Sequence, residues 1–527
     1  MELSNARHAF VTGGASGIGL AIVDALLARG VCVTAADINK EALAAESAQR
    51  GSRFAGITLD VRDRSAWSAV KQEAEARFGP VDILVNNAGI GPNARALADM
   101  NPESFDRVIA INLTGIFNGV LTFAADLRAR GTGHIINTSS IAGGLAVGRP
   151  NCGAFAAANF GIVGLSEVLR EELASHGIDV SVLCPGLVST NLGLTTSRVG
   201  GEVLDLKEPM PGSDVSSTMV ADCVMDGIAN NEPYITTHPG YAPIIEKRFA
   251  RMRRAFQISP PNPASKTLDT GKYRHAFVTG GASGIGLGVV DALLGQGLAV
   301  TVADIDEEAL APMAQRGSNV ATIALDVRDR SGWRNAKKLA ELRFGPVDIL
   351  VNNAGIGTDG RHCADAEPGS FDRMLAIDLA GVFNGVSTFA ADLRERKTGQ
   401  IVNTSSMMAL APAFAGTGAY TAAKCGVVAL SEVLRSEMAP HRVGVSVLCP
   451  AYVESNLRAN TIKAGSDVSP STMSGRVGLP LPMVGAYVVR GICENHPYIV
   501  THPDTLPSFD QRTNRILAAV ATPAKNP

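Results

Sequence analysis

The chain contains the same sequence twice. Residues 8–20 and 275–287 both read HAFVTGGASGIGL, and residues 77–91 and 343–357 both read RFGPVDILVNNAGIG. Self-similarity on this scale indicates duplicated units that each have their own core. The length of 527 residues therefore corresponds to two units of about 260 residues each rather than to one large core.

A proline-rich stretch separates the two copies. Pro260, Pro261 and Pro263 fall within four positions, which is typical of a semi-extended linker and not of a packed core. We therefore predict an N-terminal domain at residues 1–257, a linker at 258–272 and a C-terminal domain at 273–527. At about 3 Å per residue, such a linker is long enough to let the two domains pack side by side.

Within each copy, short apolar runs alternate with longer segments of helical pattern. Runs that are apolar along their whole length predict strands buried on both faces, as in a parallel sheet. Repeated strand–helix–strand units predict an α/β fold, with a Rossmann-like, doubly wound parallel sheet of about seven strands in each copy. In the second copy we expect strands at 276–278, 299–303, 321–325, 347–351, 400–404, 444–448 and 498–501.

The composition argues against several kinds of partner. The net charge is −3, with both signs interspersed, so neither nucleic acid nor an anionic membrane surface is indicated. The chain enters an apolar strand without a leader, and no apolar run approaches roughly 18 residues, so we expect a cytoplasmic protein. Cysteines form no CxxC pair and histidines form no HxH or HExxH pair, which favours a reduced compartment and gives no metal site.

A glycine-rich turn between the first strand and the first helix of the second copy predicts a dinucleotide site. Gly280, Gly284 and Gly286 would let the backbone approach a pyrophosphate, which binds the N–H groups at the helix N-terminus. Asp304 ends the second strand, where a carboxylate accepts hydrogen bonds from a ribose 2′-hydroxyl and repels a 2′-phosphate. No basic residue follows Asp304 directly, and Ser283 precedes Gly284, so we predict NAD rather than NADP as the cofactor.

Further cofactor contacts are expected where the third and fourth strands end. Asp326 ends the third strand at the place where an adenine amino group could be met. The other cofactor positions predicted in the second copy are Ile285, Val327, Asn353, Ala354 and Gly355. The first copy keeps the equivalent positions Gly13, Gly17, Gly19, Asp37, Asp60 and Asn87.

The two copies disagree at one pair of residues. Tyr420 and Lys424 are four residues apart, which places them one turn apart on one helix face. A lysine cation there would lower the pKa of the phenol and make it a usable proton donor and acceptor near neutral pH. The first copy has Phe155, which has no proton to give, and Asn159, which carries no charge. We therefore predict one working catalytic unit joined to one that cannot run the same reaction.

Several motifs in the chain resemble those of the short-chain dehydrogenase/reductase family, and the resemblance covers nearly all of both copies. These motifs are TGxxxGxG, NNAG, a serine after the fifth strand, YxxxK and a proline after the sixth strand. The resemblance implies that Tyr420 donates and accepts the proton, Lys424 binds the nicotinamide ribose, and Ser406 hydrogen-bonds the substrate oxygen. The family spacing favours Ser406 over Ser405. The family's fourth catalytic residue, an asparagine that holds a water on the proton path, is Asp378 here, which cannot donate a hydrogen bond when ionised.

The resemblance extends past the sixth strand. It implies that Pro450, Val453 and Ser455 contact the nicotinamide end of the cofactor, with Val453 near the carboxamide. Tyr452 could enter the substrate pocket. Ala451 stands where the family has glycine, and Ser455 replaces the usual threonine.

The first copy keeps the other family positions and loses only the tyrosine and the lysine. Those positions are Asn112, Ser140, Pro185, Gly186 and Thr190. We expect a domain that folds and either still holds NAD or has a purely structural role. Family subunits pair through two long helices, so the first copy would act as a built-in partner, giving a pseudo-dimer in one chain and a pseudo-tetramer in a homodimer of chains.

The least similar stretches, 191–219 and 456–484, follow the sixth strand, where family members cover their substrate. The apolar run 477–484 predicts either a flexible lid suited to hydrophobic substrates or a segment that packs on the body. We expect NAD(H)-dependent interconversion of a hydrophobic secondary alcohol, of aryl or cyclic type, and its ketone at the second copy. Two other functions stay open: a non-catalytic NAD-binding scaffold or regulator, and a lyase or epimerase.

Overall fold

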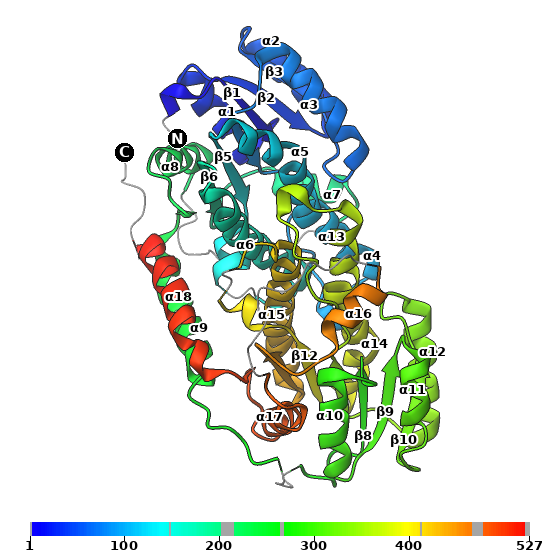
Figure 1. Cartoon of the computed structure of the whole chain (residues 1–527). Helices are drawn as coiled ribbons and strands as arrows, with labels where there is room; N and C mark the ends of the chain where they lie inside the picture. The colour runs from blue at the N-terminus through cyan, green and yellow to red at the C-terminus, as the bar shows by residue number, and fades with distance from the viewer. Residues whose placement is uncertain are drawn as a thin grey trace.

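The computed structural model describes residues 3–146, 149–201, 215–263, 268–411, 414–465 and 478–521. These residues form two α/β halves, drawn from blue to green and from green to red in Figure 1. The N-terminal strands are β1 (His8–Thr12), β2 (Cys32–Asp37), β3 (Phe54–Thr58), β4 (Ile83–Asn86), β5 (Gly133–Thr138), β6 (Ile178–Cys184) and β7 (Tyr234–Thr236). The C-terminal strands are β8 (His275–Thr279), β9 (Ala299–Asp304), β10 (Val320–Ala324), β11 (Ile349–Asn352), β12 (Gln400–Thr404), β13 (Gly444–Cys449) and β14 (Tyr498–Val500).

Helices connect these strands. Those of the N-terminal half are α1 (Gly17–Ala28), α2 (Lys40–Gln49), α3 (Arg64–Phe78), α4 (Pro102–Val108), α5 (Gly115–Arg130), α6 (Gly153–Ala174), α7 (Leu192–Arg198), α8 (Ser217–Ala229) and α9 (Ala242–Ala255). Those of the C-terminal half are α10 (Gly284–Gly295), α11 (Glu307–Met313), α12 (Arg330–Phe344), α13 (Pro368–Leu375), α14 (Gly381–Arg396), α15 (Gly418–Met438), α16 (Leu457–Lys463), α17 (Leu481–Cys493) and α18 (Leu506–Ala521).

Each half contains one parallel sheet, and the described residues give it seven strands. The strand orders are β3-β2-β1-β4-β5-β6-β7 and β10-β9-β8-β11-β12-β13-β14. Every residue of β1 and of β8 is buried, as expected for apolar strands covered by helices on both faces. The strand order reverses next to β1 and β8, where a doubly wound sheet opens a crevice at its carboxyl edge. The predicted fold of two tandem doubly wound sheets is confirmed.

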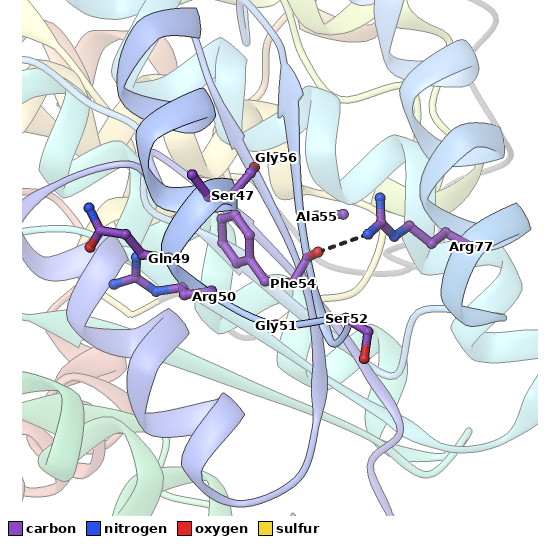
Figure 2. Close-up of a pocket in the computed structure, with 10 residues that line it drawn as sticks. Ser47, Gln49, Arg50, Gly51, Ser52, Phe54, Ala55, Gly56 and Arg77 are labelled. Atoms are coloured by element: carbon purple, nitrogen blue, oxygen red, sulfur yellow. Dashed lines mark hydrogen bonds between the residues drawn. The ribbon is translucent and has the colours of Figure 1, made fainter.

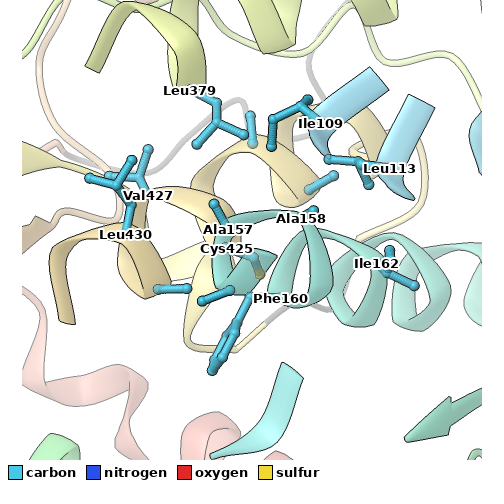
Figure 3. Packing of buried hydrophobic residues seen from close by; sticks show 14 of the residues in the cluster. Ile109, Leu113, Ala157, Ala158, Phe160, Ile162, Leu379, Cys425, Val427 and Leu430 are labelled. Atoms are coloured by element: carbon cyan, nitrogen blue, oxygen red, sulfur yellow. The ribbon is translucent and has the colours of Figure 1, made fainter. Parts of the chain in front are cut away.

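The two halves pack through α6 and α15, which lie between the sheets in Figure 1. A Cβ atom at Gly161 would come within 3.1 Å of the Ala422 carbonyl oxygen, and one at Gly426 within 3.1 Å of the Ala157 carbonyl oxygen. Glycine at these positions lets the two helix backbones approach each other closely. Buried apolar side chains from both halves, including Leu113, surround the contact (Figure 3). The predicted packing as a pseudo-dimer is therefore confirmed.

Contacts across this interface come in equivalent pairs. Phe105 stacks on Phe383 and Phe117 stacks on Phe371, with ring centroids 4.1 and 3.7 Å apart. Ion pairs repeat the pattern: Arg64–Asp372 with Arg330–Asp106, and Arg128–Asp365 with Arg394–Asp99. Reciprocal contacts of this kind are produced by an approximate two-fold axis, as in an isologous dimer interface.

The last helix of each half contacts the other half. Helices α9 and α18 lie side by side in Figure 1. Arg248 of α9 pairs with Glu432 of α15, and Arg512 of α18 pairs with Glu167 of α6, each at 2.9 Å. These ion pairs are largely shielded from solvent, so removing one partner of such a pair costs about 3–5 kcal/mol. The two halves are therefore held together both by the packing of α6 on α15 and by the ion pairs of α9 and α18.

Two helical stretches, Pro102–Arg130 and Pro368–Arg396, are long and apolar enough to cross a membrane by length and composition. Within their most apolar windows, 72% and 67% of the residues are buried inside the protein. Both stretches also carry the stacked phenylalanines of the interface between the halves. We therefore interpret them as core helices, which is compatible with a soluble protein.

Candidate functional site

The glycine-rich turn of the C-terminal half has the shape that a dinucleotide requires. Gly280 and Gly284 adopt φ angles of +60° and +52°, which residues with side chains rarely adopt. A Cβ atom at Gly286 would lie 2.0 Å from the Gly280 carbonyl oxygen, so only glycine fits there. Ser283 precedes α10, and its side chain caps none of the first N–H groups of the helix. Ile285 follows in the first turn. This cradle fits a pyrophosphate bound at the helix N-terminus.

Asp304 lies at the end of β9, beside the glycine-rich turn. Its Oδ2 accepts a hydrogen bond from the Ala282 N–H at 3.1 Å, and its Oδ1 accepts one from the Asp306 N–H at 3.1 Å. Backbone donors therefore fix the carboxylate, while each oxygen keeps a lone pair for a ribose hydroxyl. In the N-terminal half, Asp37 accepts the two equivalent hydrogen bonds at 3.2 and 3.0 Å.

The residues after β11 hold the turn in place. Asn353 Nδ2 donates to the Thr279 carbonyl oxygen at 3.2 Å, and Asn353 Oδ1 accepts from the Thr404 hydroxyl at 3.3 Å. The Ala354 N–H donates to Thr279 Oγ1 at 3.1 Å. In the N-terminal half, Asn87 Nδ2 donates an equivalent hydrogen bond to the Thr12 carbonyl oxygen, also at 3.2 Å. The predicted cofactor residues of the first and fourth strands are therefore brought together.

Asp326 lies just past β10 and is paired with Arg328 at 2.6 Å. The side-chain hydrogen bond from Arg328 lowers the pKa of Asp326 and keeps this carboxylate ionised. Asp60 and Arg62 repeat the pair in the N-terminal half, at the same distance. Val327, the next residue, is buried. The sequence placed Asp326 near an adenine but did not reveal its arginine partner.

The segment after β13 contacts the glycine-rich turn. Pro450 follows the strand directly, and Val453 pairs with Leu479 in an isolated bridge. Ser455 faces the glycine-rich turn, because a Cβ atom at Gly284 would come within 3.3 Å of the Ser455 Cβ. Ser455, which is expected at the nicotinamide end of the cofactor, therefore lies beside the turn expected to hold the pyrophosphate.

Helix α16 lies within the divergent stretch 456–484, but its contacts could not be predicted from the sequence. Thr461 accepts a hydrogen bond from the Gly357 N–H at 2.6 Å, and Lys463 pairs with Asp306 at 2.6 Å. The helix therefore bridges the ends of β11 and β9. In the N-terminal half, Thr196 makes the equivalent contact at 2.8 Å. A threonine kept at the same position of two otherwise divergent segments was the available sequence signal.

The expectation of a flexible apolar lid at 477–484 is wrong for the residues that the structure describes there. Leu481–Val484 is the first turn of α17, and Val484 is fully buried in the core. Residues 466–477 lie outside the described residues. The alternative that this run packs on the body therefore holds for residues 478–484.

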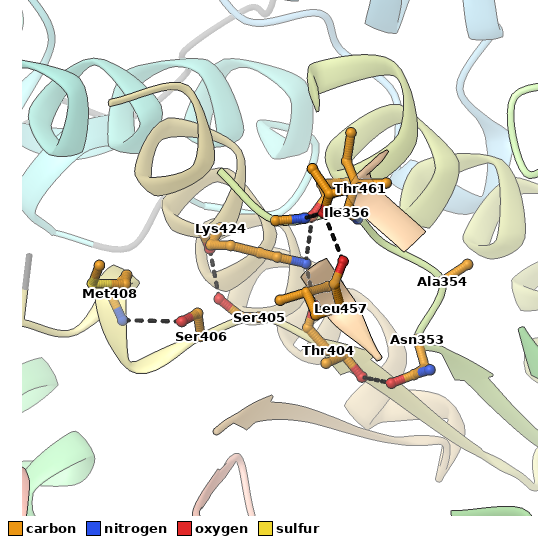
Figure 4. A network of polar contacts seen from close by, with 12 residues as sticks. Asn353, Ala354, Ile356, Thr404, Ser405, Ser406, Met408, Lys424, Leu457 and Thr461 are labelled. Atoms are coloured by element: carbon orange, nitrogen blue, oxygen red, sulfur yellow. Dashed lines mark hydrogen bonds and ion pairs between the residues drawn. The ribbon is translucent and has the colours of Figure 1, made fainter. Parts of the chain in front are cut away.

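A buried ion pair lies at the centre of the C-terminal site. Lys424 Nζ is 2.9 Å from Asp378 Oδ2 and donates to the Thr404 carbonyl oxygen at 3.3 Å. Asp378 is completely buried, and its Oδ1 accepts a hydrogen bond from the Ile356 N–H at 2.8 Å. The Tyr420 ring, one turn before the lysine, has its centroid 5.6 Å from Nζ. Figure 4 shows the lysine reaching from α15 to the ends of the strands.

Gly355 lies in close contact with the buried ion pair, after the end of β11. A Cβ atom there would come within 3.1 Å of Asp378 Oδ2 and 3.3 Å of Lys424 Nζ. Asp378 itself belongs to a π-helical turn at Ala376–Ala380 between α13 and α14. Such turns are rare and occur frequently at functional sites.

The two candidate serines have different roles. Ser405 donates its hydroxyl to the Lys424 carbonyl oxygen at 2.7 Å, so it secures the helix (Figure 4). Ser406 accepts a hydrogen bond from the Met408 N–H at 3.2 Å, which leaves its own proton for donation to Tyr420 or to a substrate oxygen. Hydrogen bonding by Ser406 also lowers the pKa of Tyr420. The geometry therefore agrees with the choice of Ser406.

The pKa of Tyr420 does not shift as the sequence suggested. Burial raises the pKa of this phenol, Lys424 opposes the rise, and Asp378 adds to it, with a net upward shift. The ring is only half-buried, so water screens part of this effect. Lys424 therefore lowers the pKa of the phenol as expected, but the expected net lowering is wrong, because burial, with Asp378 adding to it, outweighs the lysine. Burial alone lowers the pKa of Lys424, but Asp378 and Tyr420 together raise it.

The equivalent site of the N-terminal half contains no charge pair. Asn112 accepts from the Ile90 N–H and donates to the Ile90 carbonyl oxygen, both at 2.9 Å. Asn159 turns back and donates to the Phe155 carbonyl oxygen at 2.8 Å. The Phe155 ring packs on Gly143, where a Cβ atom would come within 2.9 Å of the ring. This site is neutral and its amides are satisfied, but it has no proton donor at the position of Tyr420.

Two other features contribute nothing to the site. A pocket in the N-terminal half is lined by Ser47, Arg50, Phe54 and Arg77 among others (Figure 2). It lies where β3 begins, at the opposite sheet edge from the predicted cofactor residues, and none of those residues lines it. Among the described residues no cluster of three or more His, Cys, Asp or Glu side chains could hold a metal ion.

Comparison with known proteins shows which family this chain is similar to. A family model described as short chain dehydrogenase matches the chain twice, at residues 7–198 and 274–465. An uncharacterized short-chain type dehydrogenase/reductase, y4vI, of Sinorhizobium fredii is 28% identical over 493 residues, which is 92% of this chain and 87% of that protein. This relative therefore aligns with both copies, over almost the whole chain.

Two further proteins are similar to parts or all of the chain. The 3beta-hydroxysteroid dehydrogenase 2 of Eggerthella lenta is 38% identical over 204 residues, which is 36% of this chain and 78% of that protein. The N-domain of a bacterial malonyl-CoA reductase, solved with NADP, matches with a TM-score of 0.65 at 17% identity and covers 91% of this chain and 98% of that one. At this identity the second likeness concerns the fold alone.

Proposed function

This chain belongs to the short-chain dehydrogenase/reductase family in two tandem copies, and we propose that its C-terminal half interconverts a secondary alcohol and a ketone with NAD(H). The observation that carries the proposal is the convergence of Tyr420, Lys424 and Ser406: Lys424 Nζ lies 5.6 Å from the centroid of the Tyr420 ring, and Ser406 hydrogen-bonds the phenol. The equivalent tyrosine and lysine positions of the other half hold Phe155 and Asn159.

Each residue has one task in this reaction. The nicotinamide, when bound, accepts or supplies a hydride at the carbinol carbon. Tyr420 takes the proton from the substrate oxygen during oxidation and returns it during reduction. Ser406 donates a hydrogen bond to the same oxygen and orients it. Lys424 stabilises the deprotonated phenol by its charge and is held in place by Asp378 and by the Thr404 carbonyl oxygen.

The choice of NAD over NADP rests on Asp304. Two backbone N–H groups fix its carboxylate beside the glycine-rich turn, so a negative charge is held where a 2′-phosphate would have to lie. That charge repels the phosphate and accepts hydrogen bonds from a free ribose. Asp37 has the same geometry, which supports a second NAD site in the N-terminal half.

We propose a hydrophobic, cyclic or aryl secondary alcohol as the substrate class. The relative from Eggerthella lenta is named for a 3β-hydroxysteroid, which is a bulky cyclic secondary alcohol. Leu457 and Ile462 of α16, the helix that bridges the ends of β9 and β11, are exposed and apolar. The relevant measurement is a panel of such alcohols, monitored for NADH formation.

We propose that the N-terminal half is a structural or regulatory partner that does no redox chemistry. Its neutral Asn112 and Asn159 and its Phe155 supply no proton path. All eight cysteines are free, which suits the reduced cytoplasm. For the assembly we propose a homodimer of chains, a pseudo-tetramer, with no nucleic acid or membrane partner.

The decisive variant is Tyr420→Phe. It should abolish turnover and leave NAD affinity within about twofold, because only the phenol oxygen is removed. Full turnover by this variant would exclude the assigned mechanism. The rival function, an idle NAD-binding scaffold, is favoured by the Asp378–Lys424 pair, which offsets the lysine charge. It predicts NAD binding without NADH formation for any alcohol.

A further inference from the structure

The loop that leads into the catalytic helix of the C-terminal half is anchored by a residue of the N-terminal half. Glu172 of α6 is buried, with 3% of its surface exposed. Its Oε2 accepts a hydrogen bond from the Cys363 N–H at 2.8 Å, and its Oε1 accepts one from the Gly416 N–H at 2.9 Å. One carboxylate therefore bridges two separate loops of the other half.

Both of these loops border the catalytic residues. Gly416 lies two residues before α15 and four residues before Tyr420. Cys363 packs against the start of the same helix, because a Cβ atom at Gly418 would lie 2.2 Å from the Cys363 Sγ. Thr358, in the loop after β11, donates its hydroxyl to the Gly416 carbonyl oxygen. The position of Glu172 therefore sets where the helix that carries Tyr420 begins.

The other described end of the loop between Ser406 and Tyr420 is anchored in the same manner. Arg512 donates to the Leu410 carbonyl oxygen at 3.4 Å and is itself paired with Glu167 of the N-terminal half at 2.9 Å. Both anchors of this loop thus depend on carboxylates of α6.

We propose that Glu172 is a positioning residue for Tyr420, so that the N-terminal half completes the active site of the C-terminal half. This inference rests on the proposed function, because it concerns the same tyrosine. It adds a catalytic reason for keeping an N-terminal half that cannot itself catalyse the reaction. Buried carboxylates that accept two backbone N–H groups fix loops strongly, since either lost bond leaves a buried donor unpaired.

The chain contains a matched control. Glu437 of α15 accepts hydrogen bonds from the Asn151 N–H at 2.8 Å and the Leu97 N–H at 2.9 Å, in loops of the N-terminal half. This contact is equivalent to that of Glu172, but here the carboxylate belongs to the C-terminal half and the loops to the N-terminal half. The loop that contains Asn151 precedes the helix that carries Phe155, the counterpart of Tyr420. Glu437 therefore shares the structural role of Glu172 without the predicted catalytic one.

The test compares Glu172→Gln with Glu437→Gln in the full chain. We expect Glu172→Gln to lower kcat/KM for the alcohol by about tenfold, with a fall in kcat, because small misplacements of reacting groups are costly. Glu437→Gln should leave kcat/KM within about twofold, and neither variant should change NAD affinity by more than about twofold. Equal effects of the two variants on kcat, or no effect of Glu172→Gln, would overturn the proposal.

Amide hydrogen exchange keeps this test separate from the proposed function. If the wild-type protein oxidises no alcohol in the panel, the proposed function fails, and the role of Glu172 is decided by exchange at residues 414–420. Faster exchange there in Glu172→Gln, but not in Glu437→Gln, would support it, and unchanged exchange would overturn it. If Glu172→Gln does not fold, Glu172→Asp serves instead, because its shorter side chain keeps the charge but cannot reach both N–H groups.

Discussion

The ammonium group of Lys424 lies 2.9 Å from the carboxylate of Asp378, and both side chains are buried. The N-terminal half has Asn159 and Asn112 at these two positions, so its counterpart of the pair is neutral. The charges at these two positions therefore cancel in each half. In the C-terminal half the cation of Lys424 faces the carboxylate of Asp378, and in the N-terminal half both positions hold a neutral amide. Asp378, which stands where the family has asparagine, is therefore the counter-ion of Lys424 in this site.

Asp378→Asn should shift the pH dependence of alcohol oxidation toward lower pH. Oxidation needs the deprotonated phenol, and the Asp378 charge raises the pKa of Tyr420. Removing that charge lowers this pKa, so the rising limb of the kcat/KM profile moves to more acidic pH. The new amide can donate to the Ile356 carbonyl oxygen as Asn112 does to Ile90. A profile that stays in place or moves to higher pH would contradict the assigned coupling.

Lys424→Ala should destabilise the protein as well as inactivate it. The variant leaves Asp378 buried without its cation, and breaking a buried pair in this way costs about 3–5 kcal/mol. Burial already raises the pKa of Asp378 in the folded state, and without the lysine it rises further. The folded state then binds more protons than the unfolded state, so stability should fall as pH rises above the unfolded value of about 3.9. Denaturant unfolding at several pH values measures this.

The double variant Lys424→Ala with Asp378→Asn is the control for that prediction. It removes both charges and reproduces the neutral arrangement of the N-terminal half. We expect it to recover most of the lost stability and to remove the pH dependence, but not to recover activity. If the double variant is as unstable as the single one, the loss comes from packing and not from the unpaired charge.

Gly161→Val should weaken the contact between the two halves. Its Cβ atom would come within 2.9 Å of the Leu113 Cδ2 and 3.1 Å of the Ala422 carbonyl oxygen, and the backbone oxygen cannot move away independently. Overpacking of this kind typically costs about 1–3 kcal/mol. Gly295→Ala is the control, since no atom lies within 4 Å of its added Cβ. Thermal unfolding should show a lower Tm for the first variant and an unchanged or slightly higher Tm for the second.

The chain should bind two NAD molecules, only one of which supports turnover. Gly13 and Gly17 keep positive φ angles of +64° and +56°, so the N-terminal cradle has the same shape as the C-terminal one. Calorimetry should give about two sites per chain for the wild type. Asp37→Ala should weaken one site and leave kcat unchanged, whereas Asp304→Ala should raise the KM for NAD. A single site in the wild type would show that the N-terminal cradle is only structural.

Much of the fold was accessible from the sequence because its signals are local. Apolar runs gave the strands within about two residues, and the glycine-rich turns gave the start of α1 and α10. The pairs Tyr420/Lys424 and Phe155/Asn159 could be compared because the repeat aligns them. The apolar run at 478–484 was ambiguous, since a buried first turn of α17 and a lid have the same composition.

The pairing of the halves was expected from the family resemblance, but the individual side-chain contacts between them could not be predicted, because they link residues far apart along the chain. Glu172 and Gly416 are 244 positions apart, and nothing near either residue indicates the other. The bridge formed by α16 is of the same kind, since Lys463 and Asp306 are 157 positions apart. No sequence motif around any of these four residues indicates which residue it contacts.

The sequence by itself determined that this protein has two tandem Rossmann-like sheets, two glycine cradles and one Tyr–Lys pair. These follow from strand periodicity, glycine spacing and residue identity, which need no knowledge of distant contacts. Only the tertiary structure decided that Asp378 faces Lys424, that the pKa of Tyr420 is raised instead of lowered, and that Glu172 of one half supports the catalytic helix of the other. The reason is that charge–charge energies and buried hydrogen bonds depend on distance and burial in space, which separation along the chain does not give.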